Sequence, residues 1–277
     1  MKKWRLIIDV ERCEDCNNCF LACKDEHVGN EHPGYAAEQP RHGHRWMNIS
    51  RKERGSGSLT DVFYLPQPCM HCENAPCVTA GKGAVTRRPD GIVLINPVKA
   101  KGMKDLVKSC PYGAIWWNEE AQLPQKCTLC AHLLDSGWTK PRCVQACPSE
   151  ALRIIKADDE EMRDIIAREG LEPYRPEHGT SPGVLYRNLK RHTHAFIAGS
   201  VARKEDDITD CVKGARVRLY KDGRTLAEAV TDCFGDFKFD GLEENSGGYG
   251  VDIKTPDASA GVDVELQSSV NLGDIYL

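Results

Sequence analysis

The stretch CEDCNNCFLAC at residues 13–23 places four cysteines at the spacing Cys-x2-Cys-x2-Cys-x3-Cys. A second stretch, residues 127–148, opens with CTLC and closes with CVQACP, so it repeats the final Cys-x3-Cys and adds a proline. Three cysteines in such a run bind one 4Fe–4S cluster, while the fourth cysteine binds a neighbouring cluster. The two runs therefore predict a pair of clusters that exchange their last ligands.

Zinc is the alternative for cysteine-rich loops, because a structural zinc site takes four ligands, typically from two separated pairs. The first run fits that arrangement poorly, whereas the second run by itself has a spacing that a zinc ribbon also shows. The closing Cys-x3-Cys-Pro of the second run supplies the ligand that the first run needs, which favours clusters over zinc. The first run departs from the ferredoxin pattern at one position, because Lys24 and not a proline follows Cys23. The predicted ligand sets are Cys13, Cys16 and Cys19 with Cys147, and Cys127, Cys130 and Cys143 with Cys23.

The middle of the chain carries an incomplete version of the same pattern. CMHCENAPC at residues 69–77 supplies three cysteines, and the next cysteine is Cys110, which a proline follows. A fourth cluster would need four further thiols at the ferredoxin spacing, but the chain has Gly81, Ala100, Met103 and Leu106 there. We expect apolar side chains to close that site. The remaining four cysteines predict a third cluster, held by Cys69, Cys72, Cys77 and Cys110.

Composition limits the kinds of protein that this chain can be. Of the 14 cysteines in 277 residues, only Cys211 and Cys233 follow Cys147, and so many thiols in a reducing compartment indicate metal rather than disulfides. The chain is 40% hydrophobic with a net charge of −4, which argues against nucleic-acid binding. No apolar run approaches the roughly 20 residues of a membrane span. Asp9 interrupts the N-terminal apolar run too early for a signal peptide, so we predict a cytoplasmic protein.

The cysteine distribution and the strand pattern predict an α+β fold in three segments. Residues 1–155 form a double ferredoxin-like domain, whose two fused halves hold the clusters. Residues 156–193 form a helix from Asp158 to Gly170 and an extended connector without a core of its own, because prolines and glycines recur after the helix. Residues 194–277 form a small all-β sandwich, with a hairpin turn at Asp222-Gly223. Its expected strands are 194–201, 214–221, 225–232, 236–240, 248–254, 262–268 and 271–276.

Several motifs support a family resemblance. CMHCENAPC, KSCPYGA (108–114) and QKCTLC (125–130) resemble motifs of the iron–sulfur subunits of the dimethyl-sulfoxide-reductase family of molybdopterin oxidoreductases, over about residues 5–155. CNNCF (16–20), GHRWMNI (43–49) and WNEE (117–120) resemble, within that family, the small subunits of transhydroxylases that act on polyhydroxylated benzenes. Those subunits also end in a small β-domain. The C-terminal segment is similar to transthyretin-like and carboxypeptidase-regulatory sandwiches through GARVRL (214–219) and TDCFGDF (231–237).

The resemblance implies an electron-transfer subunit that has no active site of its own. Its partner would be a large molybdopterin-containing catalytic subunit, in a heterodimer that converts pyrogallol to phloroglucinol without net electron flow. The sequence agrees with the expectation that the chain has no active site, because it shows no dinucleotide fingerprint, no nucleophile with a base and no spaced carboxylate pair. The alternatives are the electron-transfer subunit of a resorcinol-type phenol hydroxylase or of another molybdopterin reductase, a free polyferredoxin, and a zinc-binding scaffold.

Some residues near the cysteines have two interpretations. His71 lies inside a ligand loop that already has four sulfurs, so we expect a hydrogen bond near the cluster rather than ligation. Lys126 either offsets the charge of a nearby cluster or is a solvated surface lysine. We predict surface or interface contacts for His42 and His44. The remaining cysteines, Cys211 and Cys233, are expected to be free thiols.

Overall fold

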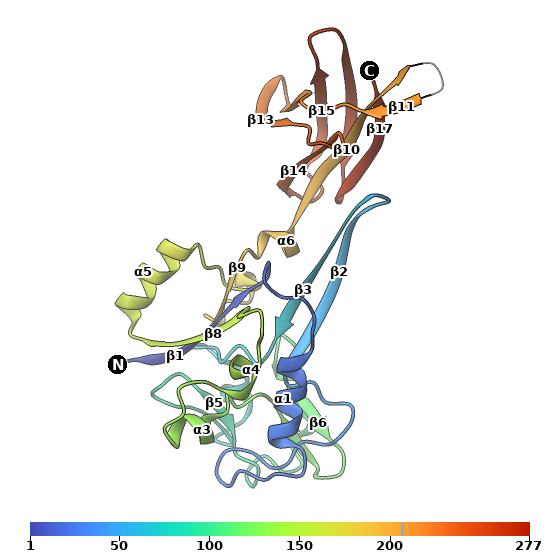
Figure 1. The fold of residues 1–277 in the computed structure, drawn as a ribbon. Helices are drawn as coiled ribbons and strands as arrows, with labels where there is room; N and C mark the ends of the chain where they lie inside the picture. The colour runs from blue at the N-terminus through green and yellow to red at the C-terminus, as the bar shows by residue number, and fades with distance from the viewer. Residues whose placement is uncertain (206–207) are drawn as a thin grey trace. The chain divides into compact units, whose positions relative to one another are not determined.

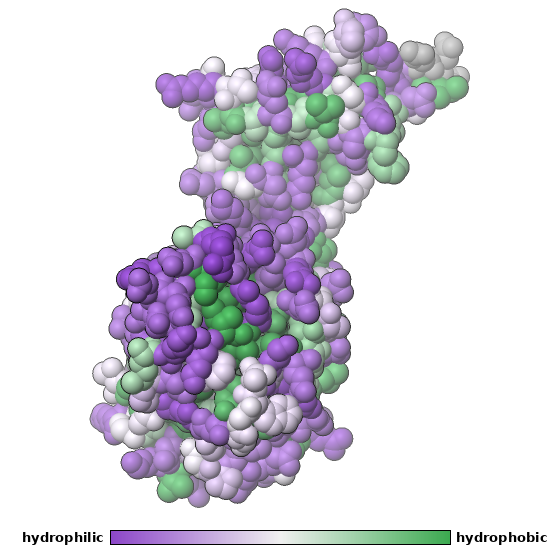
Figure 2. Space-filling view, turned by 60° about the vertical axis from the view of Figure 1, so that its left-hand side comes forward, coloured by the Kyte–Doolittle hydropathy of each residue, from purple (hydrophilic) through white to green (hydrophobic). Residues whose placement is uncertain are grey.

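The computed structural model describes residues 1–205 and 208–277, which divide into two compact units (Figure 1). The first unit consists of Met1–Arg51 and Tyr64–Leu189, and the second of Lys52–Phe63 and Lys190–Leu277. Short helices and many strands give the predicted mixed α+β character. Hydrophilic residues cover most of the face drawn in Figure 2, with a recessed hydrophobic patch in the first unit. Among the described residues, no helix has the length and apolar character that crossing a membrane requires.

A three-stranded sheet in the order β8-β1-β9 joins distant parts of the first unit. β1 (Lys3–Asp9) lies in the middle, since its apolar run is buried on both faces. It pairs antiparallel with β8 (Leu152–Ala157) and parallel with β9 (Val184–Arg187). Met162 of α5 (Asp159–Glu169) lies in one apolar core with residues of this sheet. The sheet therefore ties the start of the chain to the segments that follow the last predicted ligand.

The helix predicted at residues 158–170 is confirmed as α5. Asp158 accepts a hydrogen bond from the backbone N–H of Glu161 at 3.0 Å, and its own N–H donates to the Glu161 carboxylate at 2.9 Å, which completes a capping box. Gly170 ends the helix with a φ of 60°, a left-handed conformation that glycine adopts without strain. Local sequence is therefore sufficient to fix this element.

The connector after α5 differs from the prediction. Val184–Arg187 forms β9, and Tyr186 is fully buried, with its hydroxyl donating to the backbone oxygen of Pro66 at 2.8 Å. The apolar residues Val184, Leu185 and Tyr186 complete the sheet beside β1 in spite of the prolines and glycines around them. Part of the expected connector therefore belongs to the core of the first unit.

Short elements separate the cysteines of the first unit. The helices are α1 (Asn18–His27), α2 (Pro76–Ala80), α3 (Ala131–Asp135) and α4 (Arg142–Gln145), with 3-10 turns η1 (Lys104–Ser109) and η2 (Pro176–His178). Two antiparallel strand pairs are β4 (Val85–Arg87) with β5 (Val93–Ile95), and β6 (Trp116–Asn118) with β7 (Leu123–Gln125). Eight of the twelve cysteines in this unit are buried. These buried cysteines are part of the core of the first unit.

The second unit contains two four-stranded sheets that share one apolar core. In one sheet, β10 (His194–Glu205) pairs with β11 (Ile208–Cys211), β14 (Asp236–Glu243) and β17 (Val270–Tyr276). The other sheet has the order β13 (Arg224–Val230), β12 (Arg216–Lys221), β15 (Gly247–Lys254) and β16 (Ser259–Leu266). All seven expected strands are present with shifted ends, and β11 is an addition. Asp222 and Gly223 have φ values of 50° and 72°, so the predicted hairpin turn joins β12 to β13.

A hairpin that the sequence patterns do not predict contributes to the second unit. It consists of β2 (Asn48–Ser56) and β3 (Leu59–Gln67), and residues 52–63 belong to the second unit together with α6 (Lys190–Thr193). Gly55 has a φ of 79°, and a Cβ there would lie 2.4 Å from the backbone oxygen of Leu59, so the turn needs glycine. Asn271 donates to the backbone oxygen of Ser56 at 2.8 Å, which joins the hairpin to β17.

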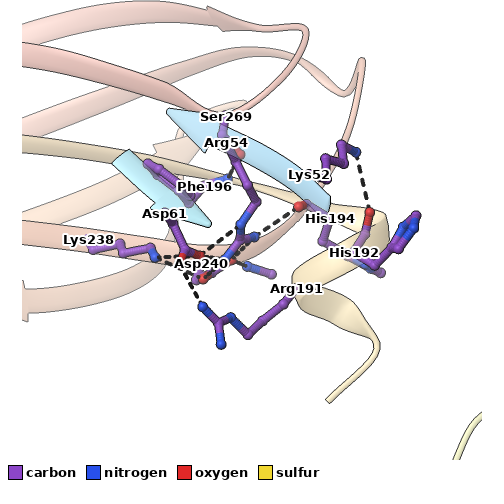
Figure 3. Close-up of polar contacts among 11 residues, drawn as sticks. Lys52, Arg54, Asp61, Arg191, His192, His194, Phe196, Lys238, Asp240 and Ser269 are labelled. Carbon is purple, nitrogen blue, oxygen red and sulfur yellow. Dashed lines mark hydrogen bonds and ion pairs between the residues drawn. The ribbon is translucent and has the colours of Figure 1, made fainter. Parts of the chain in front are cut away.

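Arg54 is the buried centre of an ion network in the second unit, and its partners are partly exposed (Figure 3). Its side chain is 3% exposed and pairs with Asp61 of β3 at 2.5 Å and with Asp240 of β14 at 2.7 Å. The guanidinium also donates to the backbone oxygen of His194 at 3.0 Å. Arg191 pairs with Asp61 at 2.6 Å, from the opposite side of the carboxylate in the view of Figure 3. The network therefore fastens the hairpin to β10 and β14.

Candidate iron–sulfur sites

The first predicted ligand set gathers near the start of α1. Cys13 and Cys16 lie in the loop before this helix, Cys19 lies in its first turn, and Cys147 follows α4. Burial, together with the charges of Cys13, Cys147 and Cys16, raises the pKa of Cys19 to about 12, which shows that the four thiols are neighbours. Cys16 is exposed, whereas Cys19 is buried. This group therefore reaches the surface of the unit.

The second predicted set gathers where α1, α3 and α4 meet. Cys23 lies in α1, Cys143 in α4, and Cys127 and Cys130 precede α3. Burial raises the pKa of Cys143 well above its usual range, and neighbouring Cys130, Cys127 and Cys23 raise it further. Burial also raises the pKa of Cys130 to about 12 and that of Cys127 to about 11. All four thiols are buried.

The third predicted set consists of Cys69, Cys72, Cys77 and Cys110. Burial, together with the charges of Cys69, Cys110 and Cys77, raises the pKa of Cys72 to about 12. Burial raises the pKa of Cys77 to about 11; Lys126 opposes this, while Cys69 and Cys110 reinforce it. The structure thus brings together each set of four that the sequence predicts, although the ligation itself stays a prediction.

The three groups adjoin one another in a series. Cys19 of the first group lies near enough to Cys23 and Cys143 of the second group to influence both pKa values. Cys69 of the third group raises the pKa of Cys127 by its charge and lowers it through a hydrogen bond from its backbone N–H. The second group therefore stands between the first and the third.

The same left-handed backbone conformation recurs in three Cys-x2-Cys loops. Asp15, His71 and Leu129, each the residue before the second cysteine, have φ values of 53°, 44° and 54°. Left-handed conformations are uncommon for residues other than glycine, so their recurrence indicates a shared loop geometry. The turn directs the N–H of His71 to Cys69 Sγ at 3.4 Å and the N–H of Leu129 to Cys127 Sγ at 3.3 Å.

The donor chemistry of the three groups fits 4Fe–4S clusters. All fourteen cysteines of the chain are free thiols, so none of the twelve is used in a disulfide. Thiols with a pKa of about 11 or 12 stay protonated at neutral pH, whereas coordination to a metal removes the proton. The N–H groups aimed at sulfur, including that of Ala114 to Cys110 Sγ at 3.4 Å, stabilise a bound thiolate. Such hydrogen bonds also influence the cluster potential.

The positions that lack thiols are packed. Ala100 and Leu106 are buried, and Met103 is partly buried. A Cβ added to Gly81 would lie 2.5 Å from Val85 Cγ2, so the space beside Gly81 is already filled. These contacts support the expectation that apolar groups close the fourth site.

Lys126 and His71 lie beside the third group. Lys126 is 3% exposed and donates from Nζ to the backbone oxygens of Val93 and Cys127, so its interpretation as a solvated lysine is wrong. Its charge lowers the pKa of Cys77, Cys110 and Cys127. His71 is 4% exposed, and burial lowers its pKa well below the usual range. A buried ammonium beside cysteines of two groups is the arrangement that would offset cluster charge.

The prediction for His44 is wrong. His42 is exposed, as expected, but His44 is buried, with Nε2 at 2.9 Å from the backbone oxygen of Trp117. Trp46 and Met47 in the same segment are also buried. The apolar residues after His44 were the available signal that this segment lies inside the unit. The expected free thiols Cys211 and Cys233 are both exposed.

A cluster of Glu26, His32 and His132 has no signature in the sequence spacing. One donor atom from each lies within 4.8 Å of the others, and the two imidazoles stack at 3.6 Å. Both oxygens of the Glu26 carboxylate already have partners, since Oε1 lies 2.9 Å from His132 Nε2 and Oε2 lies 3.2 Å from Arg142 Nε. We therefore interpret these residues as a network that joins α1 to α3 and α4 beside Cys130.

The chain is similar to known iron–sulfur proteins. Residues 60–157 match the family described as a 4Fe-4S dicluster domain. The chain is 48% identical to the pyrogallol hydroxytransferase small subunit of Pelobacter acidigallici, over 100% of both chains. It is 35% identical to a subunit of the tetrathionate reductase of Salmonella typhimurium, over 73% of this chain and 78% of that one. It is 32% identical to the thiosulfate reductase electron transfer subunit of Salmonella typhi, over 68% of this chain and 93% of that one.

Proposed function

The chain belongs to the family of iron–sulfur subunits that includes the pyrogallol hydroxytransferase small subunit, and from this premise we propose that it is the electron-transfer subunit of a cytoplasmic molybdopterin enzyme. A large partner subunit, in a heterodimer with this chain, would hold the molybdopterin and the active site. The most specific form of the proposal is a transhydroxylase that converts pyrogallol to phloroglucinol. The 48% identity over the whole chain supports that form.

We propose three 4Fe–4S clusters, one in each cysteine group. Bound clusters of this kind accept and donate single electrons. The chain supplies the four thiols of each group and the backbone N–H donors to Cys69, Cys110 and Cys127. All four cysteines of the second group and three of the third group are buried. A cluster with four cysteine ligands has no open coordination site, so the chemistry on the substrate would belong to the partner.

One observation carries the proposal: cysteines that are far apart in the sequence lie together in three groups of four. Cys147 joins the loop of residues 13–19, and Cys110 joins residues 69–77. Cys23 joins the set that contains Cys143. A scaffold that bound zinc through separate Cys-x2-Cys pairs would not need this exchange between runs. The exchange is the arrangement of two-cluster ferredoxins.

We place the clusters in a double ferredoxin-like segment, residues 1–155, and assign a structural role to residues 194–277. The proposed fold of the latter is a transthyretin-like β-sandwich. Its two thiols, Cys211 and Cys233, are exposed, and neither belongs to one of the three groups. The Arg54 network ties the β2–β3 hairpin to this part of the chain, which supports a structural role.

A second candidate is the electron-transfer subunit of a phenol hydroxylase or of another reductase, in which electrons leave the active site through the clusters. The observation that favours it is the adjoining series of the three groups, since Cys19 and Cys69 each influence the second group. In that case every turnover would deliver electrons to an external acceptor. In the transhydroxylase the clusters would instead poise the metal of the partner.

Anaerobic purification from the native source tests both forms of the proposal. We expect a large subunit that contains molybdenum or tungsten in a one-to-one ratio, and about twelve irons per small chain. An isolated chain without a large partner would contradict the complex and support a free polyferredoxin. Zinc in place of iron would overturn the cluster assignment, and about sixteen irons would contradict the closed fourth site.

A turnover assay separates the two candidates. The purified complex would be given pyrogallol with and without an artificial electron acceptor, and phloroglucinol and reduced acceptor would be measured together. A transhydroxylase forms phloroglucinol without reducing the acceptor in proportion to product. Reduction of the acceptor in step with product, or no phloroglucinol at all, would replace it with the hydroxylase or reductase.

A further inference from the structure

The side chain of His71 is held in one tautomer. The backbone N–H of Val93 on β5 donates to His71 Nδ1 at 3.0 Å. A backbone amide is always a donor, so Nδ1 has to be the acceptor and cannot carry a proton. The proton of the neutral ring is therefore on Nε2.

The Nε2–H of His71 has no acceptor among residues 1–205 and 208–277. The side chain is 4% exposed, and Nε2 is one of the buried polar atoms without a hydrogen-bond partner there. A buried donor left unpaired is costly, and native structures pair nearly all of them. The acceptor of this proton should therefore be a group that the polypeptide does not itself provide.

The loop that carries His71 is fixed around the third cysteine group. His71 stands between Cys69 and Cys72, and its left-handed backbone directs its own N–H to Cys69 Sγ at 3.4 Å. Gly183 donates to the backbone oxygen of Met70 at 2.8 Å, and a Cβ on Gly183 would lie 2.9 Å from the backbone oxygen of His71. The imidazole is thus presented from a rigid ligand loop.

Val93 connects His71 to Lys126. The N–H of Val93 donates to His71, while its carbonyl accepts from the buried ammonium of Lys126. Lys126 lowers the pKa of Cys77 and Cys110, two further members of the third group. One residue of β5 therefore holds two polar side chains beside the same four cysteines.

We propose that His71 is a potential-setting residue: its Nε2–H donates a hydrogen bond to a sulfur of the iron–sulfur cluster held by Cys69, Cys72, Cys77 and Cys110. The reduced cluster carries one more negative charge than the oxidised one, so a donor to its sulfur stabilises the reduced form and raises the potential. His71 is a positioning and tuning residue and not a ligand. The inference rests on the proposed cluster assignment.

The test uses a pair of substitutions in the anaerobically purified complex. His71→Asn keeps an acceptor near the position of Nδ1 for the Val93 N–H, loses the distal donor, and suits the left-handed backbone. His71→Gln can place an amide donor near the position of Nε2. His42→Asn, at an exposed histidine, is the matched control. Redox titration followed by electron paramagnetic resonance reports the potential of each cluster, and iron analysis reports occupancy.

We expect a tenfold fall in the equilibrium constant for one-electron reduction of one cluster in His71→Asn, which is a fall of about 59 mV, with the other clusters unchanged. His71→Gln should recover most of that fall, and His42→Asn should match the natural protein. Backbone N–H groups such as those of His71 and Ala114 give exchangeable protons near this cluster in every variant. Pulsed spectroscopy of the reduced natural protein should show one further exchangeable proton coupled to that cluster, and the asparagine variant should lack this additional proton.

Three unchanged potentials in a fully iron-loaded His71→Asn variant would overturn the proposal, as would a set of exchangeable couplings there identical to that of the natural protein. If the asparagine variant loses four irons, His71→Gln decides: an unchanged potential together with the additional coupled proton supports the donor, and a fully loaded variant without that proton refutes it. Absence of iron from the natural protein would instead refute the cluster assignment, so the two failures are distinguishable.

Discussion

Replacement of Asp61 by asparagine is expected to destabilise the second unit by about 2 kcal/mol at neutral pH. The Asp61 side chain is 18% exposed and pairs with Arg54 at 2.5 Å and Arg191 at 2.6 Å. Burial opposes its charge, but hydrogen bonds from Arg54 and Arg191 outweigh burial and lower its pKa from 3.8 to about 2. A difference of about 1.8 in pKa, at about 1.4 kcal/mol each, gives roughly 2.4 kcal/mol.

The sign of the pH dependence follows from the lowered pKa. The stabilisation is fully present above the unfolded value of 3.8 and is lost as the pH falls towards 2. The Asp61→Asn variant should therefore be less stable than the natural protein at neutral pH, and the two should converge in acid. For a unit of about 100 residues the expected loss corresponds to a fall of roughly 10–20 °C in the unfolding midpoint.

Thermal unfolding of the anaerobically purified protein, followed by far-ultraviolet circular dichroism, measures this change. Visible absorbance, followed in parallel, reports the integrity of the proposed clusters. Asp274→Asn, at an exposed carboxylate on β17, is the matched control and should change stability by less than about 0.5 kcal/mol. An Asp61→Asn midpoint equal to that of the control would refute the stabilising role of the network. A fall that is equally large at pH 7 and pH 3 would refute the electrostatic cause.

Three further changes test other parts of the chain. Cys110→Ser should lower the iron content from about twelve to about eight per chain and leave two cluster signals; loss of all iron would show that the sites are not independent. Gly81→Ala places a Cβ 2.5 Å from Val85 Cγ2 and should cost about 1–3 kcal/mol in urea unfolding, whereas a neutral result would mean that the fourth site is not packed. Asp158→Ala removes the capping box of α5 and should cost about 1 kcal/mol, seen as faster hydrogen exchange in its first turn; the exposed Asp164→Ala should not change that exchange, and equal effects would contradict the capping role.

Short-range patterns predict the parts of this protein that depend on neighbours in the sequence. The capping residues of α5 and the Asp222-Gly223 turn are examples, because the backbone conformations that they favour are those observed. The cysteine spacing went further, since the exchange rule predicted which distant thiols meet. That rule works because the first three cysteines of such a run bind one cluster and the fourth cysteine binds the neighbouring cluster.

Contacts between distant polar residues escape such patterns. Arg54 and Asp240 are separated by 186 positions, and each looks like an ordinary surface charge in the sequence. Lys126 is buried where the backbone oxygens of Val93 on β5 and of Cys127 accept hydrogen bonds from its ammonium group. Tyr186 is buried because β1 offers an open edge to the short β9. In each case the partner, and not the residue itself, determines burial.

The packed fourth site determines where the series of cysteine groups ends. The first and second groups adjoin through Cys19 and Cys143, and the second and third through Cys127 and Cys69. Gly81, one of the positions without a thiol, ends the helix that carries Cys77, so this position adjoins the third group. Cys16 at one end of the series is exposed, and Cys110 at the other end is partly exposed. Donors that raise the potential of the third group would collect electrons in that group, which suits a reaction without net electron flow.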